Sequence, residues 1–158
     1  MTKRWPGVSL FHPIHLLALG FGSGLAKKAP GTWGTVAAIP IVGLLSLLPS
    51  QVMALFIVIG GLGGIYICRK TADMMGVHDH PAIVWDEIIG FAIALYGLPF
   101  EWPYIVAAFV LFRLFDIAKP WPISWLDKHL TGGSGIMLDD ILAGAVSCLI
   151  IHGVIQFI

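Results

Sequence analysis

Charged residues are scarce in this chain. Only 11% of its 158 residues are charged, and nine basic residues balance nine acidic ones. This balance excludes a nucleic-acid binder that relies on bulk positive charge. Hydrophobic residues make up 58%, which excludes an intrinsically disordered chain. So few charges would cover little of the surface of a small soluble domain. We therefore expect residues 1–158 to form a single-domain integral membrane protein.

Cysteine is nearly absent as well. Cys68 and Cys148 both lie inside apolar runs, and the chain contains no CxxC pair. This pattern excludes a zinc site of the usual spacing, and we interpret both cysteines as small core residues.

Long uncharged runs dominate the rest of the sequence. No charge occurs between Ala29 and Cys68, and Pro49 lies in the break between two apolar halves, 33–48 and 52–68. Each half would be a helix of about 24–26 Å. The bilayer core is about 30 Å thick, so the two predict a helical hairpin that just spans it. Three more apolar runs follow, and they predict an all-α, compact multi-helix bundle: Ile88–Pro99, Tyr104–Phe112 and Ile141–Ile158.

Two of these runs, Ile88–Pro99 and Tyr104–Phe112, are short for a full crossing. They either extend into their polar flanks or enter only part of the bilayer. A shorter run at Ile14–Gly22 would lie at the interface or in the core.

Basic residues occur on alternate sides of the apolar runs. Lys27 and Lys28 precede the first hairpin, Arg69 and Lys70 follow it, and the short turns between paired runs carry only Glu101. The positive-inside rule then places every basic segment in the cytoplasm. Most of the acidic residues fall on the same side. We expect a polar active-site face at the cytoplasmic surface of the inner membrane.

Two acid pairs share one local design. Asp86-Glu87 and Asp139-Asp140 are each followed by aliphatic residues and then a glycine, Gly90 or Gly144. One interpretation is simple helix capping, because acids are favoured at a helix N-terminus. The other is metal binding, because carboxylates beside an apolar region are costly unless they are paired or bind a metal. With Asp116 they offer five oxygen ligands, enough for one Mg²⁺ ion or two.

Cations lie close to these acids in sequence. Arg113, Asp116 and Lys119 follow one another at intervals of three, which predicts either a salt-bridge ladder on one helix or a carboxylate between two cations that meet a substrate anion. Residues 20–35 are rich in glycine and hydroxyl groups, and form either a phosphate-binding loop or a flexible surface loop. They contain no Walker A pattern. His78 and His80 flank Asp79 and are either ligands or loop residues.

The polar segments together resemble the phosphatidylglycerophosphatase A family of bacterial membrane lipid phosphatases. Four stretches carry the resemblance in the order of that family: GFGSGLAKKAPGTWGTVAAIP (20–40), MGVHDHPAIVWDEIIG (75–90), FRLFDIAKPWPISWLD (112–127) and GGSGIMLDDILAG (132–144). The patterns of histidine-based phosphatidic acid phosphatases, haloacid dehalogenase-type phosphatases and alcohol phosphatidyltransferases are absent.

The resemblance implies Mg²⁺-dependent hydrolysis of the terminal phosphate of phosphatidylglycerophosphate at the cytoplasmic side of the membrane. The implied partner is a phospholipid in the bilayer, and no nucleic acid is expected. On this basis Asp86, Asp116 and Asp140 are the expected catalytic residues. The expected metal ligands are Asp86, Glu87, Asp139 and Asp140. The expected substrate-binding residues are Thr32, Thr35, Arg113, Lys119 and Lys28.

Two other classes remain open on the residues alone. An ion or solute transporter would place acids inside its spans, whereas the acids here gather at the ends of the apolar runs. A structural membrane protein would use the acids only as helix caps.

Overall fold

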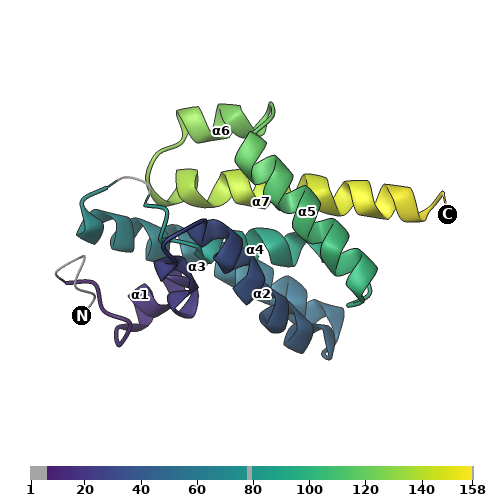
Figure 1. Cartoon of the computed structure of the whole chain (residues 1–158), viewed down its shortest axis with the longest axis horizontal. Coiled ribbons are helices and arrows are strands. Elements are labelled where there is room, and N and C mark those ends of the chain that lie inside the picture. Colours follow the sequence, from purple (N-terminus) through teal and green to yellow (C-terminus); the bar gives the residue numbers. More distant parts are fainter. Residues whose placement is uncertain (1–6, 78–79, 158) are drawn as a thin grey trace.

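The computed structural model describes residues 7–77 and 80–157, and this part of the chain is helical with no β-strand (Figure 1). This confirms the expected all-α fold. The helices are α1 (Pro13–Ala18), the 3₁₀ helix η1 (Gly20–Leu25), α2 (Pro30–Ser46), α3 (Ser50–Met75), α4 (Trp85–Ala94), α5 (Trp102–Ala118), α6 (Ile123–His129) and α7 (Gly132–Ile155).

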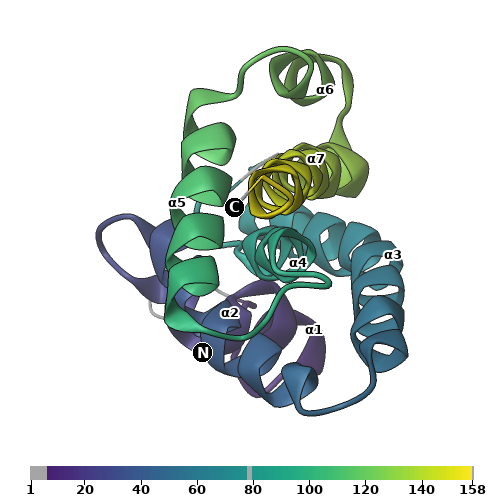
Figure 2. The ribbon, with the colours of Figure 1, turned by 90° about the vertical axis from the view of Figure 1, so that its right-hand side faces the viewer.

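The short helix α4 forms the centre of the bundle. Figure 2 shows it enclosed by α2, α3, α5 and α7, all of which contact it. Ile88, Ile89 and Phe91 are completely buried. A helix of 10 residues is about 15 Å long, half of a bilayer core. The apolar run that begins at Ile88 is therefore a core helix of the bundle and not a membrane span.

Two helices are long and apolar enough to cross a membrane, α3 and α7. Leu55, Ile59 and Leu62 on α3 and Leu149 on α7 are more than half exposed. Exposed leucine and isoleucine along a spanning helix suit contact with lipid. Length, composition and exposed surface together indicate a membrane protein.

Three of the observed helices, α3, α5 and α7, are longer than the uncharged runs that predicted them. Helix α3 continues past Cys68 to Met75 and so includes Arg69 and Lys70, while α7 begins at Gly132 and not at Ile141. Helix α5 likewise extends Tyr104–Phe112 at both ends, to Trp102 and Ala118. An uncharged run marks the part of a helix that suits lipid, whereas the backbone hydrogen bonds continue into the polar flanks.

Close helix crossings bring α4 against α7. A Cβ atom at Gly144 would collide with the carbonyl oxygen of Gly90, and one at Gly90 would lie 2.8 Å from the carbonyl oxygen of Asp140. The glycines that follow the two acid pairs in the sequence therefore face each other. Because each lies one helical turn after an acid, their contact brings Asp86 and Asp140 together as well.

Helix α4 is also fixed on its other side. The indole nitrogen of Trp85, its first residue, donates a hydrogen bond to the carbonyl oxygen of Gly60 in α3 over 2.9 Å.

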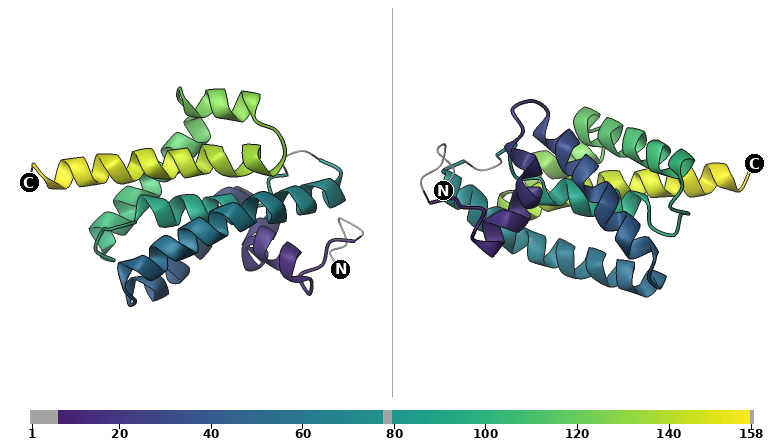
Figure 3. Two further views of the ribbon diagram at one scale, coloured as in Figure 1. Left: turned by 180° about the vertical axis from the view of Figure 1, so that it is seen from behind. Right: turned by 60° about the horizontal axis from the view of Figure 1, so that its bottom comes forward.

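The turns that join α2 to α3 and α4 to α5 lie at the same end of the molecule in Figure 1. The first turn of α7 lies at the opposite end, with α6 beside it (Figure 3).

Candidate active site

A cavity of about 380 Å³ lies where the first turns of α2 and α4 meet the end of α5 and the first half of α7. We name it the carboxylate cavity. Its lining residues are Ala29, Pro30, Gly31, Pro81, Ile83, Asp86, Glu87, Arg113, Asp116, Ile117, Lys119, Asp139 and Asp140. All five acids of the expected set line it, together with two of the expected cations.

The two acid pairs reach the cavity in different ways. Asp86 and Glu87 lie in the first turn of α4, as predicted. The expectation that Asp139 and Asp140 also open a helix is wrong, because α7 has already begun at Gly132. They lie about two turns inside that helix, so helix capping does not explain them.

Asp86, Glu87 and Asp140 form a cluster. Each offers a carboxylate oxygen, and these oxygens lie within 4.8 Å of one another. Asp86 is 9% exposed and Asp140 only 3%. Within residues 7–77 and 80–157, Glu87 Oε2 and Asp140 Oδ2 are buried oxygens with no hydrogen-bond partner. Buried carboxylate oxygens of this kind are strongly unfavourable without a cation.

The protonation of Glu87 reflects the same surroundings. Burial, reinforced by the negative charge of Asp140, raises the pKa of Glu87 to about 8. Glu87 therefore holds a proton near neutral pH when no cation is present, because the protein surroundings do not offset a further negative charge there, and a bound cation would displace that proton.

Arg113 joins this cluster to α5. Its Nη1 atom lies 2.5 Å from Asp116 Oδ2 and 3.7 Å from Glu87 Oε1. The three side chains are largely buried, so these ion pairs are only weakly screened by water. Arg113 is therefore held at the edge of the carboxylate cluster, inside the cavity.

The contacts of Lys119 differ from those of the expected salt-bridge ladder, in which it would pair with Asp116. It is the residue after α5 and adopts a left-handed conformation, with φ of 41°. Its Nζ atom binds Asp127 and lies 2.7 Å from Asp139 Oδ2, while Asp116 pairs with Arg113. Burial alone lowers the pKa of Lys119, but the hydrogen bonds with Asp127 and Asp139 outweigh burial and raise it. Asp139 is thus directed to Lys119 rather than to the three-carboxylate cluster.

Gly31 is a residue of the cavity that the sequence analysis did not single out. A Cβ atom there would collide with Glu87 Oε1 and lie 3.1 Å from both terminal nitrogens of Arg113. Only glycine lets the first turn of α2 approach this ion pair. The sequence feature that could have pointed to Gly31 is its position directly before Thr32 in the glycine-rich segment.

Three of the expected substrate-binding residues are not brought into the carboxylate cavity. Lys28 is exposed. Thr32 is half-buried beside Gly31, and the buried Thr35 hydroxyl donates to the Gly31 carbonyl oxygen over 3.0 Å. Their roles in binding stay predictions. His78 and Asp79 fall outside the described residues, while His80 lines a neighbouring cavity.

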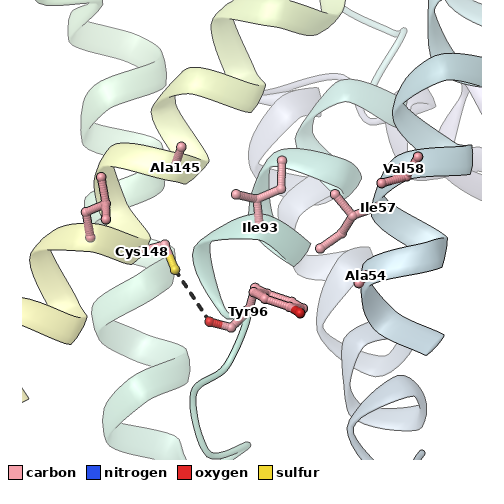
Figure 4. Close-up of a pocket in the computed structure, with 8 residues that line it drawn as sticks. Ala54, Ile57, Val58, Ile93, Tyr96, Ala145 and Cys148 are labelled. Carbon is pink, nitrogen blue, oxygen red and sulfur yellow. Dashed lines mark hydrogen bonds between the residues drawn. The ribbon is translucent and has the colours of Figure 1, made fainter. Parts of the chain in front are cut away.

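An apolar cavity of about 360 Å³ lies between α3, α4 and α7 (Figure 4). Ala54, Ile57, Ile93 and Ala145 line it, and the thiol of Cys148 donates to the Tyr96 carbonyl oxygen over 3.4 Å. No carboxylate or basic side chain is among its described lining residues. This cavity therefore offers no charged side chain of the described residues to a phosphate.

Comparison with known proteins identifies the family of the chain. The sequence model of the phosphatidylglycerophosphatase A family matches residues 16–155. Phosphatidylglycerophosphatase A of Escherichia coli strain K12 is 50% identical over 146 residues, covering 92% of this chain and 85% of the relative. The protein of that name from Haemophilus influenzae is 50% identical over 159 aligned positions, covering 98% of this chain and 97% of the relative.

A third relative carries a different name. The putative phosphatidylinositol-3-phosphatase of Bacteroides thetaiotaomicron is 38% identical over 150 residues, covering 89% of this chain and 92% of the relative. No solved structure matches the chain. The family match and the two relatives at 50% identity show that the chain belongs to the phosphatidylglycerophosphatase A family, and that it is a phosphatase.

Proposed function

We propose that this protein hydrolyses the terminal phosphomonoester of phosphatidylglycerophosphate, releasing phosphatidylglycerol and phosphate, with Mg²⁺ as cofactor. The reaction would take place at the cytoplasmic surface of the inner membrane, which the protein crosses more than once. One observation carries the proposal: three buried carboxylates converge beside Arg113 in a single cavity.

The residues of the cavity fit Mg²⁺. This ion prefers oxygen ligands and usually takes one or two carboxylates together with waters and phosphate oxygens. Asp86, Glu87 and Asp140 offer such oxygens within 4.8 Å of one another, and some of these oxygens are buried without a hydrogen bond. Bound Mg²⁺ would act as a Lewis acid on the phosphoryl group and offset the charge of the carboxylates.

The side chains of α5 would bind and orient the phosphoryl group. Arg113 can grip two phosphoryl oxygens at once, because a guanidinium offers parallel donors. Asp116 and Glu87 both form ion pairs with Nη1 of Arg113 and so hold its guanidinium in place. Lys119, held by Asp127 and Asp139, adds positive charge at the same cavity.

The reaction needs a nucleophile, and the cavity has no cysteine or histidine among its described lining residues. We assign attack to water, with Asp116 as the group that orients it and accepts its proton. The new bond joins the water oxygen to phosphorus. The bond that breaks joins phosphorus to the glycerol oxygen, which leaves and takes up the proton that Asp116 accepted from the water.

The location of the cavity suits a lipid headgroup. It lies where α7, a candidate span, begins, so a headgroup could enter while its acyl chains stay in the bilayer. The names of the relatives refer to phosphatidylglycerophosphate and phosphatidylinositol 3-phosphate. Both lipids carry a phosphomonoester on an alcohol that a phosphodiester joins to diacylglycerol.

The alternative of a structural membrane protein is disfavoured by the position of Asp139 and Asp140 inside α7. Acids that serve only as caps belong in the first turn. Membership of a phosphatase family speaks against a transporter.

Phosphate release by the purified protein in mixed micelles tests the substrate. We expect hydrolysis of phosphatidylglycerophosphate at a much higher kcat/KM than that of soluble glycerol 3-phosphate, which lacks the membrane anchor. Equal kcat/KM for the two would contradict a lipid phosphatase. Failure to hydrolyse phosphatidylglycerophosphate would contradict the proposed reaction.

A further inference from the structure

A further apolar cavity lies at the opposite end of two helices that carry the carboxylate cavity. It has a volume of about 500 Å³ and lies between the second half of α2 and the start of α5. We name it the far cavity, and its lining residues are Ile39, Pro40, Gly43, Phe100, Glu101, Trp102 and Ile105. A Cβ atom at Gly43 would lie 2.8 Å from the Phe100 ring, so this ring lies directly against α2.

Helices α2 and α5 lead from one cavity to the other. The start of α2 and the last turns of α5 line the carboxylate cavity, so the two helices run in opposite directions. Both contact α4, which is visible between them in Figure 1. Gly31 and Ile39 on α2 are eight residues apart, as are Ile105 and Arg113 on α5. Each pair spans about 12 Å along its helix, within the depth of about 15 Å that one leaflet gives to the bilayer core.

The path between the two cavities is apolar on both helices. Val36 lies one turn before Ile39 on the same face of α2, and it is 38% exposed. Phe109 lies one turn from both Ile105 and Arg113 on α5, and it is partly buried against the core. A hydrocarbon chain that leaves the carboxylate cavity along these faces therefore meets apolar side chains up to the far cavity.

The proposed headgroup site identifies the occupant of this path. Ile117 lines the carboxylate cavity and is 70% exposed, so the cavity has an apolar edge on α5. A phospholipid whose phosphomonoester lies beside Arg113 needs such an edge for its acyl chains. The apolar cavity of Ile93 and Ala145 does not adjoin this edge, because α4 and α7 lie between α3 and α5 (Figure 2).

We propose that the far cavity, with the sides of α2 and α5 that lead to it, binds one acyl chain of the lipid whose phosphomonoester is hydrolysed. The inference rests on the proposed function. A chain gains little hydrophobic free energy when it leaves other lipid, so selection arises from packing in the cavity. Ile39 and Phe100 are the specificity-determining residues, since they line the end that a long chain reaches and a short chain does not.

A competition assay with the full-length protein in mixed micelles tests this assignment. Dihexanoyl and dipalmitoyl phosphatidylglycerophosphate are supplied together, and mass spectrometry of the products gives the ratio of their kcat/KM values. Ile39→Trp fills the far cavity, so we expect the preference for the dipalmitoyl lipid to fall about fivefold relative to wild type. Leu62→Trp is the matched control, since Leu62 is exposed on α3 and lines neither cavity.

A second variant changes the far cavity in the opposite direction. Phe100→Ala removes the ring that lies against Gly43 and so enlarges the cavity. We expect this variant to raise the kcat/KM of a substrate with dibehenoyl chains, which are longer than palmitoyl chains, relative to that of the dipalmitoyl lipid. A purely structural role of either side chain predicts an equal loss for every chain length.

Each outcome decides between the assignments. An unchanged ratio in Ile39→Trp would overturn the inference, because the path would then be covered by lipid that is not the substrate. An equal loss for all chain lengths would also overturn it, and would indicate a structural role or a contact with a second copy of the chain. If Ile39→Trp does not fold, the ratio in Phe100→Ala decides alone. A wild-type protein inactive on every one of these lipids would instead contradict the proposed function itself.

Discussion

At the scale of single residues, the burial of Asp140 needs a reason. This carboxylate is 3% exposed, lies inside an apolar helix and faces two further acids of α4. Burying a charge without a partner costs several kcal/mol or forces the group to take up a proton. A protein that served only to pack helices would gain stability from an amide at this position. We infer that the acid is kept for its chemistry.

The first prediction follows for Asp86, Asp116 and Asp140. Replacing each with asparagine removes charge but little volume. Each variant should lose about 10²-fold or more in kcat while it still inserts, because stabilising transition-state charge is worth several kcal/mol. Phosphate release measures kcat, and circular dichroism checks the fold. Asp73→Asn, on the exposed end of α3, is the control, and near wild-type kcat in all three variants would contradict the assignment.

A second prediction concerns Arg113. Its Nη1 atom forms ion pairs with Asp116 and Glu87, its Nε atom has no hydrogen-bond partner among the described residues, and its side chain lines the cavity. Arg113→Lys keeps the charge but loses the parallel donors, so we expect kcat/KM to fall about tenfold or more. If lysine supports wild-type kcat/KM for phosphatidylglycerophosphate, the guanidinium does not grip the phosphoryl group in the assigned way.

At the scale of helices, the contact between Gly90 and Gly144 sets the distance between α4 and α7. The third prediction is that Gly144→Ala destabilises the protein by about 1–3 kcal/mol, because the added methyl group overpacks the crossing. A thermal melt in detergent measures this as a lower Tm. Gly153→Ala is the matched control, since a Cβ at Gly153 meets no atom within 4 Å. Equal Tm values for the two variants would contradict the role of this crossing.

How far the sequence predicts the helices is clear from the two acid pairs. Their shared pattern includes the two glycines, Gly90 and Gly144, that allow the close approach of α4 and α7, and burial cost pointed to the same acids. The start of α7 could not be predicted in this way. Its first residues, Gly-Gly-Ser-Gly, are typical of a loop, but Gly133 packs against the Ile65 backbone of α3 and is helical. Tertiary packing there overrides local propensity.

The partners of Lys119 show a similar limit. Spacing along one helix favours Asp116 as its neighbour, yet the chain turns at Lys119 and carries its side chain to Asp127 and Asp139. The first of these acids belongs to α6, a helix that the sequence analysis did not predict. The neighbouring cavity that His80 lines was also beyond prediction, because it joins residues 24–30 to residues 80–82.

At the scale of the whole molecule, the chain should lie across the membrane in one orientation. The fourth prediction is that the turn before α3 faces the outside and that α6 faces the cytoplasm. The reason is that basic residues gather at the end of the molecule where α6 lies, and basic segments stay in the cytoplasm. Single cysteines at Ser50 and Lys128 test it, with Cys148 replaced by alanine and Cys68 left buried. An impermeant maleimide should label Ser50→Cys in intact cells and Lys128→Cys only after lysis. The opposite pattern would reverse the topology.

The central claim is that the carboxylate cavity works as a Mg²⁺-dependent phosphatase site. Five acids face two cations in this cavity, so the negative charge exceeds what the protein itself offsets. The most direct measurement is phosphate release from phosphatidylglycerophosphate by purified protein, first in excess EDTA and then during a titration with Mg²⁺. We predict no release in EDTA and full recovery with Mg²⁺, whereas Asp140→Asn should need far more Mg²⁺ or fail to recover. Undiminished release in excess EDTA would contradict the account.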